Sequence, residues 1–173
     1  VIGCGMVGIG ALAASVNRGS EVIAVDIDDS KMEIAKKIGV TNTINTSKTN
    51  LHKALAEITC GDGPDVIIEA AGNPLTYKAA IEEVAYKGRV ICVGYTNRPV
   101  EINTDIFVKK ELEVLGARNS IDEFTEVISY LESGKFPVNE VITKIVFIDE
   151  AENALIEWSD NPGTITKIMV TFD

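Results

Sequence analysis

The glycine pattern Gly3-Cys4-Gly5-Met6-Val7-Gly8 restricts the fold of this chain more than any other feature of its sequence. Val1 and Ile2 precede the pattern as the end of a strand, and an apolar helical segment follows it. In a G-x-G-x-x-G turn the first glycine permits the tight bend, the second lets the backbone approach a pyrophosphate, and the third lets helix pack on strand. The free N–H groups and the positive end of the helix then face the phosphates. The pattern therefore favours an α/β fold with an anion site at its first turn.

An acidic residue ends the next predicted strand, the apolar run 21–26 (EVIAVD). Asp26 stands about 20 residues beyond the glycines, where a carboxylate can accept hydrogen bonds from both hydroxyls of an adenosine ribose. Taken alone, Asp26 would be an ordinary turn former, but strand, glycines, helix and acid occur in register. A 2′-phosphate would lie against this carboxylate, and like charges about 4 Å apart repel by a few kcal/mol at an effective dielectric of about 20. We therefore expect a nucleotide site that prefers NAD to NADP.

Apolar runs and helical segments alternate as far as residue 119. Further strands are expected at residues 43–45, 65–70, 89–93 and 112–117. We expect Ser30 and Glu33 to form a capping box for the second helix, and Asn73 with Pro74 to begin the fourth, which closes at Gly88. The order β-α-β-α-β-α-β-α-β-β implies α/β architecture with a doubly wound parallel sheet and right-handed crossovers.

The C-terminal segment, residues 120–173, has a different pattern. A helix with an apolar stripe that includes Phe124 and Leu131 is followed by a strand, a helix containing Leu155 and Trp158, and a last strand. A six-stranded sheet does not need these elements, so we predict a domain boundary between 119 and 120 and a tail that packs on a part of the protein outside this chain. The chain opens inside a strand without methionine, and we expect it to be a piece of a longer polypeptide.

Composition excludes several other classes of protein. The 173 residues are 46% hydrophobic and 24% charged, as in a globular domain, and they contain no uninterrupted apolar span of about 18 residues and no signal peptide. The lack of such a span predicts no membrane partner. A net charge of -10 would repel polyphosphates, so we expect no nucleic acid as a partner either. Cys4, Cys60 and Cys92 are widely spaced and odd in number, which suits a reducing compartment and predicts a cytoplasmic protein.

Four segments together resemble the cofactor half of the zinc-type medium-chain alcohol and polyol dehydrogenases: GCGMVGIGALAASVNRGSEVIAVDIDDSKMEIAKKIGV, GPDVIIEAAGNP, KGRVICVGY and KKELEVLGARNS. The resemblance covers nearly the whole chain and implies a Rossmann sheet in the order 3-2-1-4-5-6. It implies that the tail returns to a GroES-like catalytic domain, which precedes the Rossmann region in this family. Residues 99–104 (PVEINT) read as a short edge strand, and the resemblance implies that it pairs with its two-fold mate in a homodimer.

The resemblance also implies the cofactor contacts. The pyrophosphate would lie on Gly3, Gly5, Met6, Val7, Gly8 and Lys167, the adenosine ribose on Asp26 and Lys31, the adenine on Ile27 and Ala71, and the nicotinamide on Val93, Tyr95, Ala117 and Asn119. Lys31 and Lys167 are equally typical of solvated surface charges. Val93 and Ala117 are equally typical of core positions.

No catalytic or metal site is expected within this chain. The zinc ligands of the resembling family, a Cys, a His and a further Cys or acid, lie upstream of the glycine pattern, and the three cysteines here cannot replace them. His52, the only histidine, is expected on the surface. Glu69 ends a strand at the cofactor edge, but its position in the family is structural.

Three functions remain open at this point. The first is the cofactor-binding part of an NAD-dependent dehydrogenase that transfers a hydride between a secondary alcohol and the nicotinamide; the segment 116–120 (GARNS) most resembles branches that act on polyols or sugar acids. The second is a non-catalytic, nucleotide-sensing Rossmann regulatory domain, which the nicotinamide-side strands and the tail disfavour. The third, an S-adenosylmethionine methyltransferase, fits the third glycine and the tail poorly. We expect the first function, with a chain that binds cofactor but is inactive alone.

Overall fold

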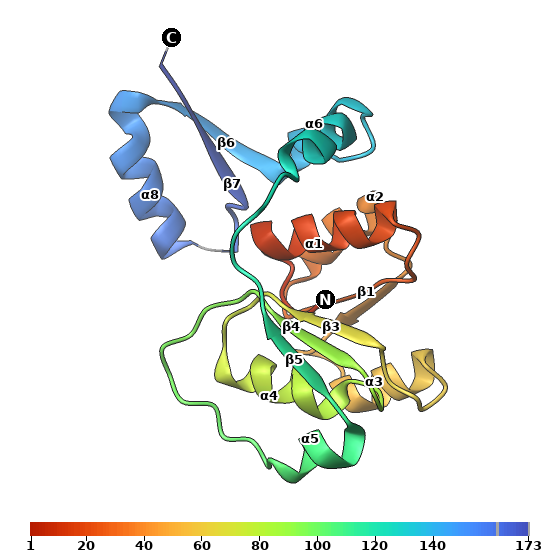
Figure 1. Ribbon diagram of the computed structural model, residues 1–173. Coiled ribbons are helices and arrows are strands. Elements are labelled where there is room, and N and C mark those ends of the chain that lie inside the picture. The colour runs from red at the N-terminus through yellow and green to blue at the C-terminus, as the bar shows by residue number, and fades with distance from the viewer. Residues whose placement is uncertain (162, 173) are drawn as a thin grey trace. The chain divides into compact units, whose positions relative to one another are not determined.

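The structure is a computed structural model that describes residues 1–161 and 163–172. The chain divides into two compact units, Val1–Glu123 and Phe124–Asp173. Figure 1 shows the first unit in red to green and the second in teal to blue.

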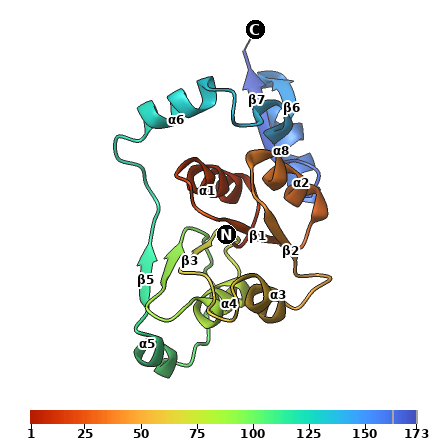
Figure 2. The same cartoon turned by 90° about the vertical axis from the view of Figure 1, so that its right-hand side faces the viewer.

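A parallel sheet forms the centre of the first unit (Figures 1 and 2). Its strands are β1 (Ile23–Asp26), β2 (Asn42–Asn45), β3 (Val66–Glu69), β4 (Arg89–Cys92) and β5 (Glu113–Gly116). β1 pairs with β2, and β4 pairs with both β3 and β5, always in parallel. Ile2 joins the two groups because it pairs in parallel with both Val25 and Glu69. With the segment at Ile2 counted as the first strand, the order is 3-2-1-4-5-6, as predicted.

Helices cover both faces of this sheet. They are α1 (Met6–Asn17), α2 (Asp29–Ile38), α3 (Leu51–Ile58), α4 (Pro74–Glu83) and α5 (Asp105–Lys110). Figures 1 and 2 show α1 and α2 on one face and α3, α4 and α5 on the other. Leu12 of α1 packs with Ala24 of β1 in the core of the first face. Leu55 of α3 and Ile81 of α4 pack with Val90 of β4 in the core of the second. The predicted doubly wound α/β fold is therefore confirmed.

The N-terminal capping residue agrees with the sequence-based prediction in α4 and differs from it in α2. α4 begins as predicted, with Asn73 as a capping residue whose side chain accepts a backbone hydrogen bond, and Pro74 in the first turn. For α2 the predicted capping box of Ser30 and Glu33 is wrong. The capping residue is Asp28, whose Oδ1 accepts the backbone N–H of Ser30 at 2.9 Å and its hydroxyl at 2.8 Å. A carboxylate at this position satisfies a free amide and also interacts favourably with the helix dipole.

Two further details differ from the sequence-based expectation. α4 ends at Glu83 rather than Gly88, because Val84 turns to an extended conformation and is fully buried in the core. The expected edge strand at 99–104 is not formed: residues 99–103 have no strand assignment in the single chain. A strand is defined by its ladder partner, so pairing of this segment with a second copy stays a prediction.

The second unit is built around a β-α-β motif. It comprises α6 (Phe124–Glu132), α7 (Val138–Val141), β6 (Ile142–Phe147), a 3-10 turn (Ile148–Glu150), α8 (Ala151–Asp160) and β7 (Lys167–Thr171). β6 and β7 are parallel, and Val146 and Ala154 are buried between strand and helix. Phe124 and Leu155 are 72% and 58% exposed, and packing of this tail on a part of the protein outside the chain stays a prediction. Among the described residues, no helix has both the length and the apolar character needed to cross a membrane.

Candidate nucleotide-binding site

The glycine turn links the segment at Ile2 to α1 and depends on glycine at two positions. Gly3 has a φ of +92°, and a Cβ there would lie 2.8 to 2.9 Å from atoms of Ala71. A Cβ on Gly8 would approach the carbonyl oxygen of Gly3 to 1.7 Å, so helix and turn are in direct contact. At Gly5 a Cβ would meet nothing within 4 Å. The first and third glycines therefore allow close packing, while the second leaves the backbone open to a ligand.

The N-terminus of α1 presents backbone amides beside this opening. Gly5 is the capping residue, and none of the described side chains caps the helix. The helical ladder begins with the N–H of Ile9, which donates to the carbonyl of Gly5 at 2.8 Å. The amides of Met6, Val7 and Gly8 therefore lie in the first turn, where intrahelical acceptors are lacking. With no acidic residue in this turn, the helix end is suited to a phosphate group.

The carboxylate of Asp26 is held against the glycine turn. Its Oδ2 accepts the backbone N–H of Cys4 at 2.6 Å, and its Oδ1 accepts those of Ile27 at 2.7 Å and Asp28 at 3.0 Å. A carboxylate has about four acceptor positions, so one remains for a further donor such as a ribose hydroxyl. The end of β1 and the glycine turn are thus connected by a direct hydrogen bond.

The thiol of Cys4 lies in the glycine turn next to Asp26. The thiol is fully buried, and burial, followed by the negative charge of Asp26, raises its pKa to about 12, while the positive charges of the N-terminus and Lys31 lower it by smaller amounts. Ile27 is 71% exposed on the loop after β1. The contact of Lys31 with an adenosine ribose stays a prediction.

The residues expected at the nicotinamide gather at the carboxyl ends of β4 and β5. The N–H of Val93 donates to the carbonyl of Glu69 at 2.9 Å, and that of Ala117 donates to the carbonyl of Cys92 at 3.0 Å. Tyr95 is 87% exposed, and Asn119 is exposed in the loop after β5.

Lys167 belongs to the other compact unit of the chain. It is the exposed first residue of β7, in the second unit. Its contact with a pyrophosphate stays a prediction.

Glu69 is a residue whose surroundings the sequence did not reveal. Its side chain is fully buried at the end of β3, and Oε1 accepts hydrogen bonds from the amides of Ala71 and Gly72 and from the hydroxyl of Thr76. Within the part of the chain that the structure describes, Oε2 has no hydrogen-bond partner. The sequence signal for this arrangement is an acid that ends an apolar strand and is followed by small residues, in the segment IIEAAG.

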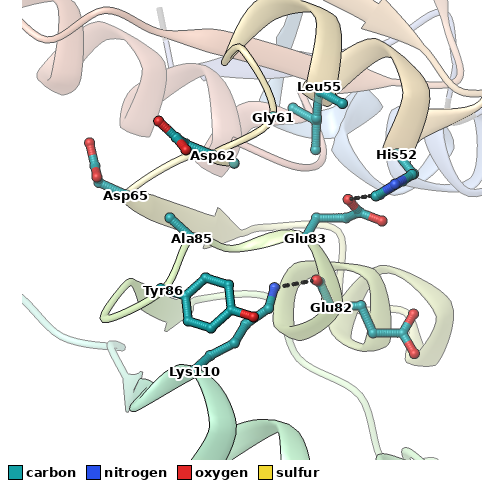
Figure 3. Close-up of a pocket in the computed structure, with 12 residues that line it drawn as sticks. His52, Leu55, Gly61, Asp62, Asp65, Glu82, Glu83, Ala85, Tyr86 and Lys110 are labelled. Carbon is teal, nitrogen blue, oxygen red and sulfur yellow. Dashed lines mark hydrogen bonds and ion pairs between the residues drawn. The ribbon is translucent and has the colours of Figure 1, made fainter.

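Figure 3 shows a depression at the opposite edge of the sheet. Asp65, which precedes β3, contributes to its lining. Two of the polar groups are already paired: Nδ1 of His52 lies 2.9 Å from Oε2 of Glu83, and Nζ of Lys110 donates to the carbonyl of Glu82 at 2.7 Å. The side chain of His52 is 78% exposed, as predicted for a surface histidine. Ligands of open α/β sheets bind beyond the carboxyl ends of the strands, so this depression is not the nucleotide site.

A zinc site is not assembled by the residues that the structure describes. No group of three or more His, Cys, Asp or Glu side chains in that part of the chain could hold a metal ion. Cys4, Cys60 and Cys92 are free cysteines. A tetrahedral zinc site requires three or four convergent ligands, so we assign no zinc ligand to these residues.

Comparisons with known proteins agree with this geometry. A family model described as "Zinc-binding dehydrogenase" matches residues 6–133, and the chain therefore belongs to the zinc-binding dehydrogenase family. A zinc-type alcohol dehydrogenase-like protein of Haemophilus influenzae, itself uncharacterized, is 31% identical and is matched over 99% of this chain and 50% of its own length. The family resemblance predicted from the sequence is confirmed.

Solved structures give the same result for the fold. 2R,3R-butanediol dehydrogenase from Bacillus subtilis superposes with a TM-score of 0.89 at 26% identity, over 99% of this chain and 50% of that one. An alcohol dehydrogenase from Escherichia coli CFT073, solved in complex with NADH, superposes with a TM-score of 0.87 at 26% identity, over 99% and 51% of the two chains. This chain spans about half the length of the relatives that it matches.

Proposed function

We propose that this chain is the NAD-binding part of a zinc-type alcohol dehydrogenase. The observation that carries the proposal is the joint geometry of the uncapped α1 N-terminus and the Asp26 carboxylate, which the amide of Cys4 holds at 2.6 Å. These groups offer what an adenine dinucleotide requires: amides and a helix dipole for two phosphates, and an acceptor for ribose hydroxyls. One relative of similar fold was solved with NADH, which supports the choice of ligand.

The residues of the chain then have distinct binding roles. The opening at Gly5 admits the pyrophosphate to the amides of α1, while Asp26 and Lys31 hold the adenosine ribose. Ile27 and Ala71 contact the adenine. Val93, Tyr95, Ala117 and Asn119 orient the nicotinamide, and Lys167 approaches the pyrophosphate.

The reaction we propose for the intact enzyme is oxidation of a secondary alcohol. The alcohol carbon transfers a hydride to the nicotinamide of bound NAD and the hydroxyl proton is released, which gives a ketone and NADH. The role of this chain is to hold the dinucleotide in one orientation. A polyol or sugar acid is the substrate class that we favour, supported by the GARNS segment at 116–120 and, for a small diol, by the butanediol dehydrogenase of similar fold.

Calorimetric titration with NADH, ATP and S-adenosylmethionine tests the proposal. Of the three ligands, NADH is expected to bind most tightly. Tight binding of ATP without NADH would favour a nucleotide-sensing regulatory domain, and binding of S-adenosylmethionine would favour a methyltransferase. Failure to bind NADH would refute the proposal.

Two properties of the intact protein belong to the same proposal. We infer a homodimer formed through residues 99–104, as in the resembling family. The three free cysteines support a reducing, cytoplasmic location.

A further inference from the structure

Glu69 connects the loop after β3 to the loop after β4. On one side, Oε1 accepts the N–H of Ala71 at 3.1 Å, the N–H of Gly72 at 2.9 Å and the hydroxyl of Thr76 at 2.7 Å. On the other side, the carbonyl oxygen of Glu69 accepts the N–H groups of Val93 at 2.9 Å and of the following glycine at 2.8 Å. One residue therefore holds five donors, four of them in the two loops and one at the start of α4.

These two loops touch each other and the glycine turn. A Cβ on Gly72 would lie 2.5 Å from the carbonyl oxygen of Tyr95, and one on Gly94 would lie 2.3 Å from the amide nitrogen of Gly72. A Cβ on Gly3 would lie 2.8 Å from the amide nitrogen of Ala71. The pair Ala71-Gly72 is thus in contact both with the turn proposed for the pyrophosphate and with the segment proposed for the nicotinamide.

The second carboxyl oxygen of Glu69 is in an energetically unfavourable environment. Oε2 is buried without a hydrogen-bond partner among the described residues, and a Cβ on Gly94 would lie only 2.4 Å from it. A buried polar atom without a hydrogen bond lowers stability, so other interactions of the same side chain must offset its cost. Here the other oxygen accepts the amides of Ala71 and Gly72 and the hydroxyl of Thr76, which also lies 2.8 Å from the carbonyl oxygen of Asn73.

We propose that Glu69 is a positioning residue that fixes the Ala71-Gly72 loop between the two ends of the cofactor site. This inference rests on the proposed function, because it concerns binding of the same dinucleotide. Glu69 does not contact the ligand; it acts through Ala71, which faces the adenine, and through Gly72, which supports Tyr95. A ligand that spans both ends depends on this loop more than one that occupies the adenosine end alone.

Two substitutions of Glu69 distinguish the loss of the carboxylate charge from the loss of the hydrogen-bond acceptor. Glu69→Gln keeps an oxygen that can accept all three side-chain hydrogen bonds, whereas Glu69→Leu leaves the amides of Ala71 and Gly72 without an acceptor. Glu57→Leu removes an exposed glutamate from α3 and is the matched control. The measurement is the dissociation constant of NADH, which spans the site, and of AMP, which occupies the adenosine end.

With Glu69→Leu we expect the affinity for NADH to fall at least about tenfold, and that for AMP to fall no more than about threefold. Glu69→Gln and Glu57→Leu are expected to remain within about threefold of the original chain for both ligands. Loss of stability alone would not change the affinity of the folded protein, so titrations are made well below the melting temperature of each variant.

NADH affinity within about twofold of the original in folded Glu69→Leu, or an equal loss for NADH and AMP, would overturn the inference while leaving the proposed function intact. If Glu69→Leu does not fold, Thr76→Val takes its place, because it removes one of the three groups that donate to Oε1. Thr76→Val should lower the affinity for NADH about threefold and leave the affinity for AMP unchanged. If neither affinity changes, the inference is overturned as well. An original chain that does not bind NADH overturns the proposed function and this inference together.

Discussion

Replacing Asp26 tests whether the carboxylate at the end of β1 selects between the two nicotinamide dinucleotides. NADP carries a 2′-phosphate on the ribose that we place at this carboxylate, and the amide of Cys4 holds the carboxylate at 2.6 Å. Two unit charges about 4 Å apart repel by about 4 kcal/mol at an effective dielectric of about 20. Asp26 is only half-buried, so water and salt reduce this repulsion. We expect NADH to bind at least about tenfold more tightly than NADPH, which corresponds to about 1.4 kcal/mol.

Two variants distinguish loss of charge from loss of geometry. Asp26→Ser removes the charge and shortens the side chain, whereas Asp26→Asn keeps its length and one acceptor oxygen. Both should reduce the preference to below about threefold if charge is the cause. Asp62→Ser removes an exposed acid at the opposite edge of the sheet and should leave the preference unchanged.

Calorimetric titration of NADH and NADPH provides the two dissociation constants. At about 0.5 M salt the ratio of the NADPH and NADH dissociation constants should become smaller for the original chain, because salt screens the charge repulsion. The same salt should have little effect on this ratio in Asp26→Ser. Equal affinities for the two cofactors in the original chain, or an undiminished preference in both variants, would refute the reasoning.

Other expected outcomes follow from the same structure. Iodoacetamide at pH 8 should label exposed Cys60 first and Cys4 last, because a pKa of about 12 leaves about one Cys4 thiol in ten thousand as the reactive thiolate. The thiolate fraction of Cys4, and therefore its labelling rate, should rise with pH. Equal labelling of Cys60 and Cys4, measured by mass spectrometry, would contradict this expectation. Lys110→Met should lower the free energy of unfolding by about 1 to 2 kcal/mol in denaturant titrations, because Nζ of Lys110 donates to two carbonyls at the C-terminal end of α4. Lys109→Met is the control. Equal stability of the two variants would contradict this role of Lys110. The purified chain should contain no stoichiometric zinc by elemental analysis and should not reduce NAD with sorbitol, idonate, threonine or butanediol; one zinc per protomer or measurable turnover would show the expectation to be wrong. Sedimentation should give a dimer that Ile102→Pro weakens, and a monomer at about tens of micromolar would exclude it.

The fold was largely predictable because its strands are short apolar runs separated by recognisable turn residues. Asn73 and Pro74 marked the start of α4 correctly, since capping chemistry is local. The end of α4 was not predictable: Val84 is buried either as part of a helix or in an extended segment, and hydrophobic periodicity cannot distinguish these. The start of α2 was missed because Asp28 and Ser30 are both good capping residues only two positions apart.

The candidate site was predictable where a motif carries its own geometry, as for Gly3 and Asp26. The contacts of Glu69 were not, because its hydrogen bonds to the amides of Ala71 and Gly72 depend on how the chain turns after β3. Its tight approach to Gly94 depends on a second loop more than 20 residues away, and nothing in the local pattern reports it.

The bridging position of Ile2 has a consequence for the energetics of the whole first unit. Among the described residues, the two groups of strands are joined at this short segment, where the N–H of Ile2 donates to the carbonyl of Ile68 at 2.9 Å and that of Gly3 donates to the carbonyl of Val25 at 2.8 Å. The junction between the two groups of strands is therefore also the start of the glycine turn. Opening of this junction would disrupt the turn, so we expect a dinucleotide bound at the turn to stabilise the first unit, by an amount that rises with ligand concentration.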